Sequence, residues 1–274
     1  IKAITQKGLD SRNMILCTDD CHSGTLVHEG HMNRVIRHAI DCGCDPLIAL
    51  QMATINTATH FGLEREIGSL TPGRRADVIL TSDLKTLPIE RVIARGKTVA
   101  LEGKLAADCP HLKWPDRVRR TVHVRKKLEA IDFEIHAPKD CNRVTANVIG
   151  VVENQAPTKA LKRDLPVLND IVEAAEDTCQ VALVERHNAT GGVTNAFITG
   201  FNYKGKMAMA STVAHDSHHM IVVGTDRSQM ALAANRLAEV GGGITIFRDN
   251  TEIALVELPI AGLISATLFS LGHY

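Results

Sequence analysis

The chain has 274 residues, of which 45% are apolar and 23% charged, and its Lys and Arg equal its Asp and Glu at 31 each. This composition is typical of a globular protein with a substantial core, and zero net charge argues against a nucleic-acid or anionic-membrane partner. No apolar run reaches the roughly 20 residues that a membrane span needs. Seven cysteines without a C-x-x-C pair argue against a disulfide framework, so we expect a cytoplasmic protein.

The first predicted element is a buried parallel strand at residues 14–18, because a short apolar run there ends abruptly in polar residues. A helix is expected at residues 28–42. A second helix begins after Asp45, which can act as its N-cap, and runs to a stop at Gly62. Strand, polar loop and helices together predict that residues 1–62 form the last βα unit of a TIM-type α/β barrel.

The next segment, residues 63–121, has a different character. Short strands at 78–80 and 92–94, separated by tight turns, predict a small β-unit belonging to a composite β-sandwich domain. Residues 101–121 are expected to form a connector.

The third region, residues 122–274, is predicted to be an incomplete α/β domain. Asp226 caps a strongly patterned helix that extends to Val240. A polar stretch at 153–180 is expected to loop over the surface. Strands are predicted at residues 123–125, 133–136, 148–152, 207–213, 220–223 and 244–247.

Two acidic residues, Asp19 and Asp20, follow the first predicted strand. In α/β barrels the catalytic groups gather at the carboxyl ends of the strands. A carboxylate at this position could bind a divalent cation and accept a proton, while its neighbour, pointing elsewhere, could contact substrate. The alternative is that the pair forms a turn that caps the following helix.

A second polar cluster, residues 215–219, contains His215, His218 and His219 with one carboxylate. In an extended segment alternate residues share a face, so His215 and His219 would point one way and His218 the other. The functional interpretation is a lid that contacts substrate; the alternative is a solvated polar turn. Among the remaining histidines, His22, directly after the acidic pair, is the strongest candidate for a functional role.

The order of the downstream motifs connects these residues to a family. Residues 67–79 resemble the G-x-L-x-P-G-x-x-A-D turn that follows the eighth barrel strand in the amidohydrolase superfamily. Residues 184–187, 190–192, 214–219 and 224–226 (V-E-R-H, T-G-G, A-H-D-S-H-H and G-T-D) resemble the C-terminal domain of bacterial adenine deaminases. The resemblance extends from about residue 1 to about residue 264.

The resemblance implies a metal-dependent hydrolase of adenine salvage or catabolism. In this family a dinuclear centre, with manganese or ferrous iron, activates a water that attacks C6 of adenine and yields hypoxanthine and ammonia. Asp19 matches the metal-ligand and proton-shuttle position. Asp20 matches a position that could face the purine. The resemblance also favours the lid interpretation of His215, His218 and His219, in contact with substrate or with the residues around the metal. Adenine is thus the expected partner, with no nucleic acid or membrane, in a full-length homo-oligomer.

The resemblance also implies that most of the barrel, with the other metal ligands, lies outside this sequence. We therefore expect the isolated chain to be inactive. One alternative is another amidohydrolase, such as a cyclic amidase, which shares the Asp and the β-tail but lacks the third region. A further alternative is a non-catalytic regulatory or interaction domain.

Overall fold

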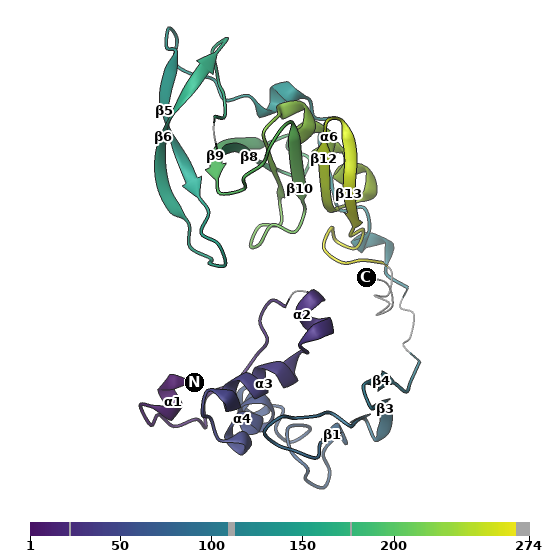
Figure 1. Cartoon of the computed structure of the whole chain (residues 1–274). Helices are drawn as coiled ribbons and strands as arrows, with labels where there is room; N and C mark the ends of the chain where they lie inside the picture. Colours follow the sequence, from purple (N-terminus) through teal and green to yellow (C-terminus); the bar gives the residue numbers. More distant parts are fainter. Residues whose placement is uncertain (22, 109–112, 176, 267–274) are drawn as a thin grey trace. The chain divides into compact units, whose positions relative to one another are not determined.

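The computed structural model describes residues 1–21, 23–108, 113–175 and 177–266. The chain divides into two compact units, which we call the N-terminal unit (Ile1–His111) and the C-terminal unit (Leu112–Ser270), and each is described by itself (Figure 1). The division falls within the segment that the sequence predicts as a connector. Together the units make a mixed α/β protein. Among the described residues, no helix is both long and apolar enough to cross a bilayer.

The N-terminal unit begins with five short helices. Asp45 is the N-cap of the fourth, as predicted: its carboxylate accepts hydrogen bonds from Leu47 N at 2.9 Å and Ile48 N at 3.2 Å. Both predicted helices are interrupted, the first at Gly30, where φ is +108°, and the second at Thr54. The helices are α1 (Lys2–Thr5), α2 (Ser23–His28), α3 (Met32–Asp41), α4 (Pro46–Ala53) and α5 (Ile55–His60).

The predicted strand at residues 14–18 is wrong. This segment is irregular, and its backbone forms hydrogen bonds with residues of α4 and α5. Leu16 N donates to Met52 O at 3.2 Å, and the Asn56 amide donates to Met14 O at 3.0 Å. A parallel strand exists only where a neighbouring strand satisfies its backbone groups. No strand of the described chain pairs with these residues, so the apolar run packs against helices instead.

The predicted small β-unit follows, and its strands lie at or next to the predicted positions 78–80 and 92–94. It is an antiparallel sheet of four strands in the order β1-β2-β3-β4. Asp77, just before β1, holds the turn between the second and third strands, because its carboxylate accepts a hydrogen bond from Arg95 N at 2.7 Å. The strands are β1 (Val78–Leu80), β2 (Arg91–Ala94), β3 (Lys97–Leu101) and β4 (Lys104–Leu105).

The C-terminal unit is built on one nine-stranded sheet in the order β13-β12-β10-β11-β8-β9-β5-β6-β7. Neighbouring strands are antiparallel except for the parallel pair β5 and β9. Short 3-10 turns η1 (Asp116–Val118) and η2 (Ala130–Phe133) precede it. The strands are β5 (Arg143–Gly150), β6 (Lys159–Leu168), β7 (Ile171–Val172), β8 (Thr178–Val184), β9 (Val193–Thr199), β10 (Met207–Ser211), β11 (Met220–Gly224), β12 (Gly243–Arg248) and β13 (Thr251–Glu257).

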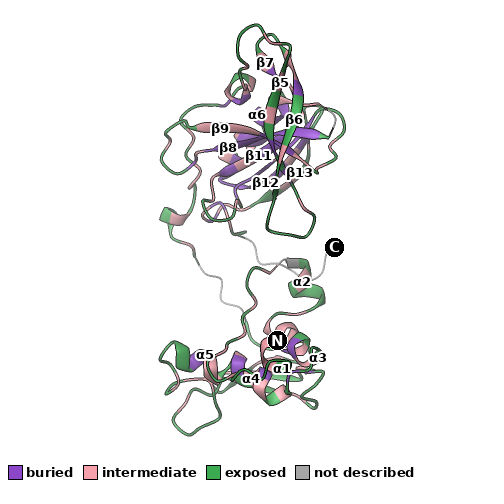
Figure 2. Ribbon diagram, turned by 90° about the vertical axis from the view of Figure 1, so that its left-hand side faces the viewer, coloured by how far each residue is buried: buried purple, intermediate pink, exposed green. Residues whose placement is uncertain are grey.

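Helix α6 (Arg227–Val240) packs against β10, β11 and β12 and forms the main core with them. It begins at the predicted cap, Asp226, and ends at Gly241, whose φ of +85° reverses the chain. Two of its own side chains, Met230 and Leu237, are fully buried. Figure 2 shows the buried residues gathered in the central strands of this sheet.

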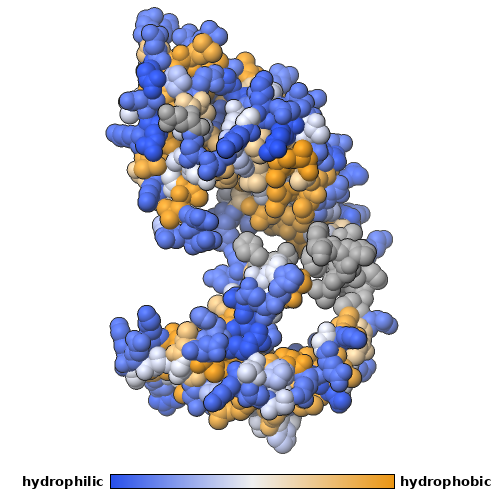
Figure 3. Space-filling model, in the orientation of Figure 1, coloured by the Kyte–Doolittle hydropathy of each residue, from blue (hydrophilic) through white to orange (hydrophobic). Residues whose placement is uncertain are grey.

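The opposite face of the sheet carries a smaller cluster around Val181 and Val223. Figure 3 shows apolar surface over β10, β12 and β13 on the visible side of the unit. Leu183 is 38% exposed and Val256 54% exposed, so part of the apolar surface of the sheet faces solvent.

Three predictions for the C-terminal unit are wrong. Residues 123–125 and 133–136 are not strands; the first is an extended connection and the second follows η2. Residues 153–180 are not a polar loop, because they contain β6, β7 and the start of β8. The outward-facing charged residues of β6 hide its period-2 pattern, since it lies near the sheet edge and faces water over most of its length. Strand β5 is predicted only in part, at residues 148–152.

Candidate functional site

The acidic pair lies in the N-terminal unit, in the loop before α2. Both carboxylates are exposed. Asp19 adopts the left-handed region, with φ of +53°, and its own carboxylate accepts a hydrogen bond from Asp20 N at 2.9 Å. This local turn is typical of Asp and fixes the backbone between the two residues. It leaves the acidic side chains on the surface of the unit, where they can meet a ligand.

The described residues do not fit a complete metal centre. They contain no group of three His, Cys, Asp or Glu side chains that could hold a metal ion. His22, the histidine next to the acidic pair, lies outside the described residues. Asp19 can supply one hard oxygen ligand, and a dinuclear centre needs several more.

The second predicted cluster is a tight turn, which we call the histidine loop (residues 214–219, between β10 and β11). His218 N donates to Ala214 O at 2.7 Å, and φ is +73° at Asp216 and +48° at His218. The predicted alternation of side chains is therefore wrong, because it requires an extended segment. His215 is exposed, with its Nδ1 3.3 Å from the Asp216 carboxylate.

The structure brings a further histidine to this loop. His187 comes from the connection between β8 and β9; its Nε2 lies 3.0 Å from Ser217 O, and its ring centroid lies 4.8 Å from that of His219. The Nδ1 atoms of His218 and His219 are buried and make no hydrogen bond within the described structure. The rings of His187 and His219 thus pack together, and the Nδ1 atoms of His218 and His219 are enclosed by the fold.

Glu185 shapes the connection that carries His187. Its carboxylate accepts hydrogen bonds from His187 N at 2.5 Å, Asn188 N at 2.8 Å and Thr190 N at 2.8 Å. Burial raises the pKa of Glu185, but these backbone donors and the Thr190 hydroxyl outweigh it and lower the pKa to about 2. The connection is therefore organised by one permanently ionised side chain at neutral pH.

Arg186 lies between these two residues and is 1% exposed. Its guanidinium donates to His218 O at 2.6 Å and to Ala261 O at 3.2 Å, and it also reaches Thr121. Sequence reasoning did not select Glu185, Arg186 or His187 as site residues. The signal was present in the V-E-R-H motif that follows β8, where a strand of apolar residues ends in three adjacent polar ones.

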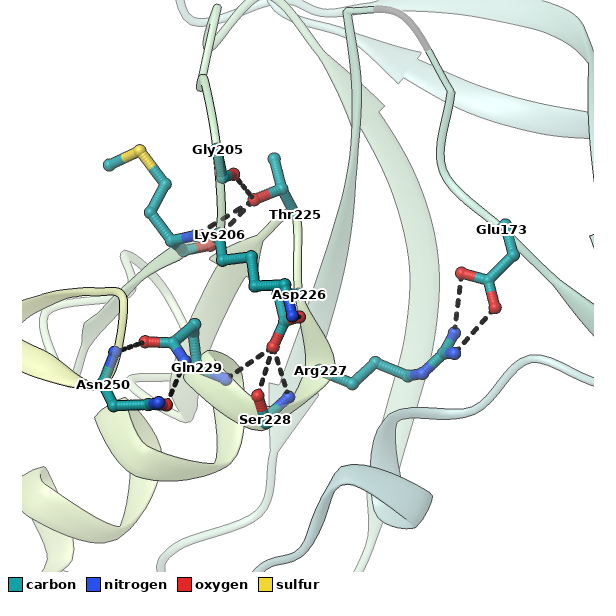
Figure 4. A network of polar contacts seen from close by, with 10 residues as sticks. Glu173, Gly205, Lys206, Thr225, Asp226, Arg227, Ser228, Gln229 and Asn250 are labelled. Atoms are coloured by element: carbon teal, nitrogen blue, oxygen red, sulfur yellow. Dashed lines mark hydrogen bonds and ion pairs between the residues drawn. The ribbon is translucent and has the colours of Figure 1, made fainter.

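A separate polar network surrounds the start of α6 (Figure 4). The Asp226 carboxylate accepts from Ser228 N at 3.0 Å and Gln229 N at 3.2 Å, and Arg227 pairs with Glu173 at 2.7 Å. A hollow of about 250 Å³ opens beside these groups. The hydrogen bonds and the ion pair satisfy the side chains within the fold, so the network stabilises the helix start and its connection to the segment after β7.

Comparison with known families and proteins assigns the two units. Residues 1–99 match the Amidohydrolase family, and residues 155–270 match the Adenine deaminase C-terminal domain. The first match lies within the N-terminal unit and the second within the C-terminal unit.

Individual relatives give a more specific assignment. The chain is 78% identical to the adenine deaminase of Ruegeria sp. (strain TM1040) over 97% of its own length and 44% of that relative. It is 77% identical to the adenine deaminase of Ruegeria pomeroyi over the same shares, and 43% identical to that of Moorella thermoacetica over 97% of this chain and 45% of the relative. The chain is thus similar to adenine deaminases over nearly all of its own length, and it spans less than half the length of these relatives.

Proposed function

We propose that the full-length protein carrying this chain hydrolyses adenine to hypoxanthine and ammonia, in adenine catabolism or purine salvage in the cytoplasm. The observation that carries the proposal is the 78% identity to an adenine deaminase over 97% of the chain. Both family matches occur in the order expected for such an enzyme. The match of the C-terminal unit favours this activity over the cyclic amidase, which lacks that unit, and over a non-catalytic domain.

In this proposal the N-terminal unit is the end of a metal-dependent α/β barrel, and Asp19 is a metal ligand that also carries a proton. Manganese or ferrous iron suits a carboxylate ligand of this kind, and such a metal would activate the attacking water. The remaining ligands would come from parts of the protein beyond these 274 residues, since the described residues gather no three-ligand group. The chain by itself would then be inactive.

The same proposal gives the histidine loop and Asp20 a role in holding the purine. Adenine offers ring nitrogens that accept hydrogen bonds and an amino group that donates them. Neutral imidazoles offer both a donor and an acceptor, and Asp20 offers an acceptor. The exposure of the His215 side chain supports this assignment. His218 and His219, which are partly exposed, complete the proposed set.

The direct test is ammonia release from adenine by the full-length protein after reconstitution with manganese. Asp19→Asn should lower kcat by about a hundredfold or more, because a neutral amide binds the metal weakly and cannot carry the proton. The matched control is Asp41→Asn, which changes another exposed aspartate of the N-terminal unit and should leave activity unchanged. Full activity of the Asp19→Asn protein would overturn the role of Asp19, and no ammonia from the unaltered protein would overturn the proposed function.

A further inference from the structure

Arg186 is a charged side chain whose hydrogen bonds all end on neutral oxygens in the described structure. Its Nε donates to His218 O at 2.6 Å, Nη2 to Ala261 O at 3.2 Å, and Nη1 reaches the carbonyl and hydroxyl of Thr121 at 3.4 and 3.5 Å. Burial lowers the pKa of Arg186. Burying a cation without a carboxylate partner lowers the stability of the folded protein. Arg186 is therefore expected to have a role other than stabilising the fold.

The fold makes room for this guanidinium. Gly262 has φ of +72°, and a Cβ built on it would lie 2.8 Å from Nη1 and 3.0 Å from Cζ of Arg186. The Gly262 carbonyl is itself fixed by the Thr212 hydroxyl, which donates to it at 2.6 Å. The guanidinium therefore lies flat against a glycine backbone, and any side chain at position 262 would displace it.

Arg186 and His187 together hold consecutive carbonyls of the histidine loop. Arg186 Nε donates to His218 O, and His187 Nε2 lies 3.0 Å from Ser217 O. His218 is in the left-handed region, which costs a residue other than glycine about 1 kcal/mol or more. Two bonds from the neighbouring connection thus hold the loop in a conformation that its own backbone does not prefer.

We propose that Arg186 is the positioning residue of the histidine loop: through the His218 carbonyl it fixes the backbone that presents His218 and His219 to the purine. Arg186 touches no substrate in this role and acts through the loop. The inference rests on the proposed function for its effect on adenine, but the fixing of the loop does not depend on which ligand binds there.

The first measurement is amide hydrogen exchange of residues 214–219 in the full-length protein, which reports loop order without any activity. Arg186→Met keeps an unbranched apolar stem and removes every donor. Exchange at His218, whose N–H is bonded to Ala214 O, should become about tenfold faster, since local opening is the step that limits exchange. Arg186→Lys retains a donor and should restore most of the protection. Arg248→Met, a change at an exposed arginine, is the matched control and should alter nothing in the loop.

The second measurement separates binding from chemistry. If the loop binds adenine equally in the ground and transition states, Arg186→Met should raise KM about tenfold and leave kcat within about twofold. Arg186→Lys should recover most of the KM. A general structural defect would instead reduce the amount of active protein, and so kcat, and the lysine would not selectively restore KM.

Two outcomes would overturn the proposal: unchanged exchange in the loop of Arg186→Met, or a loss confined to kcat. Should Arg186→Met fail to fold, His187→Leu removes the second bond to the loop, because leucine has no donor, and should change exchange and KM in the same direction by a smaller factor. No change in either would also overturn the proposal. If the unaltered protein does not deaminate adenine, the proposed function fails, while the exchange measurement still decides whether Arg186 fixes the loop.

Discussion

The two units of this chain use similar elements but bury them to different extents. In the C-terminal unit, α6 alone buries six residues against a nine-stranded sheet. In the N-terminal unit, α4 buries two residues and α5 one, while Phe61 is 66% exposed and Leu70 83% exposed. The histidine loop is thus anchored on a closed core, whereas Asp19 belongs to a unit with a small one. The difference indicates that a functional side chain is held more firmly where the core that supports it is larger.

The largest expected effect tests this difference in core packing. Leu237→Ala, at a fully buried position of α6, should lower the free energy of unfolding by about 3–4 kcal/mol, because the closed core cannot collapse around the cavity. Met52→Ala, at a position 1% exposed in the N-terminal unit, should cost only about 2 kcal/mol. Urea unfolding followed by circular dichroism measures both. The exposed Leu232 of the same helix is the control, and Leu232→Ala should cost less than about 1 kcal/mol.

Equal decreases in the free energy of unfolding for Leu237→Ala and Met52→Ala would contradict the proposed difference in core packing between the two units. They would mean that the N-terminal unit packs as firmly as the C-terminal one. That result would conflict with two hollows in the N-terminal unit, of about 640 and 590 Å³, which are lined by residues of its helices and small sheet.

The next effect compares the same chemical device in both units. Asp45 and Asp226 each accept two backbone N–H bonds at the start of a helix. Asp45→Ala and Asp226→Ala should each cost about 1 kcal/mol. Hydrogen exchange should show the first loss only in α4 and the second only in α6. If Asp45→Ala also loosens α6, the two units do not unfold independently.

The smallest effect concerns pH. Folding lowers the pKa of Glu185 to about 2 from an ordinary value of 4.5. A depressed carboxyl pKa contributes stability that is fully present above pH 4.5 and is lost as the pH falls towards 2. Glu185→Gln should therefore be less stable than the unaltered protein by no more than about 1 kcal/mol at pH 7, and the gap should narrow between pH 4.5 and 2. Thermal unfolding across this range is the measurement, and a gap that widens on acidification would contradict it.

Local signals predicted part of the fold. Asp45 and Asp226 are helix caps as expected, and Gly241 ends α6. These elements depend on neighbours in the sequence, so the residues themselves carry the information. The strand at 14–18 failed because a parallel strand depends on a partner that the described chain does not supply. The segment 153–180 failed because the charged outer face of β6 resembles a loop.

The candidate site was predicted by residue type rather than by geometry. His218 and His219 share a cluster, as the sequence suggested, but the turn that joins them uses two left-handed residues that alternation could not foresee. Arg186 and His187 reach the loop across a long stretch of chain, and such contacts are fixed only by the pairing of β8 with β11. Whether Asp19 binds a metal is still a prediction, since its role rests on the family.

The close approach of Arg186 to Gly262 has a consequence for interpreting natural or engineered variation. An alanine at position 262 would look like a harmless change of one methyl group in a buried turn, far along the sequence from the histidine loop. Its methyl group would push the guanidinium away, because a Cβ there falls within 3.0 Å of Cζ. The variant would then show its defect in the histidine loop rather than in the turn. A screen that scored residues only by their place in the histidine loop would miss this position.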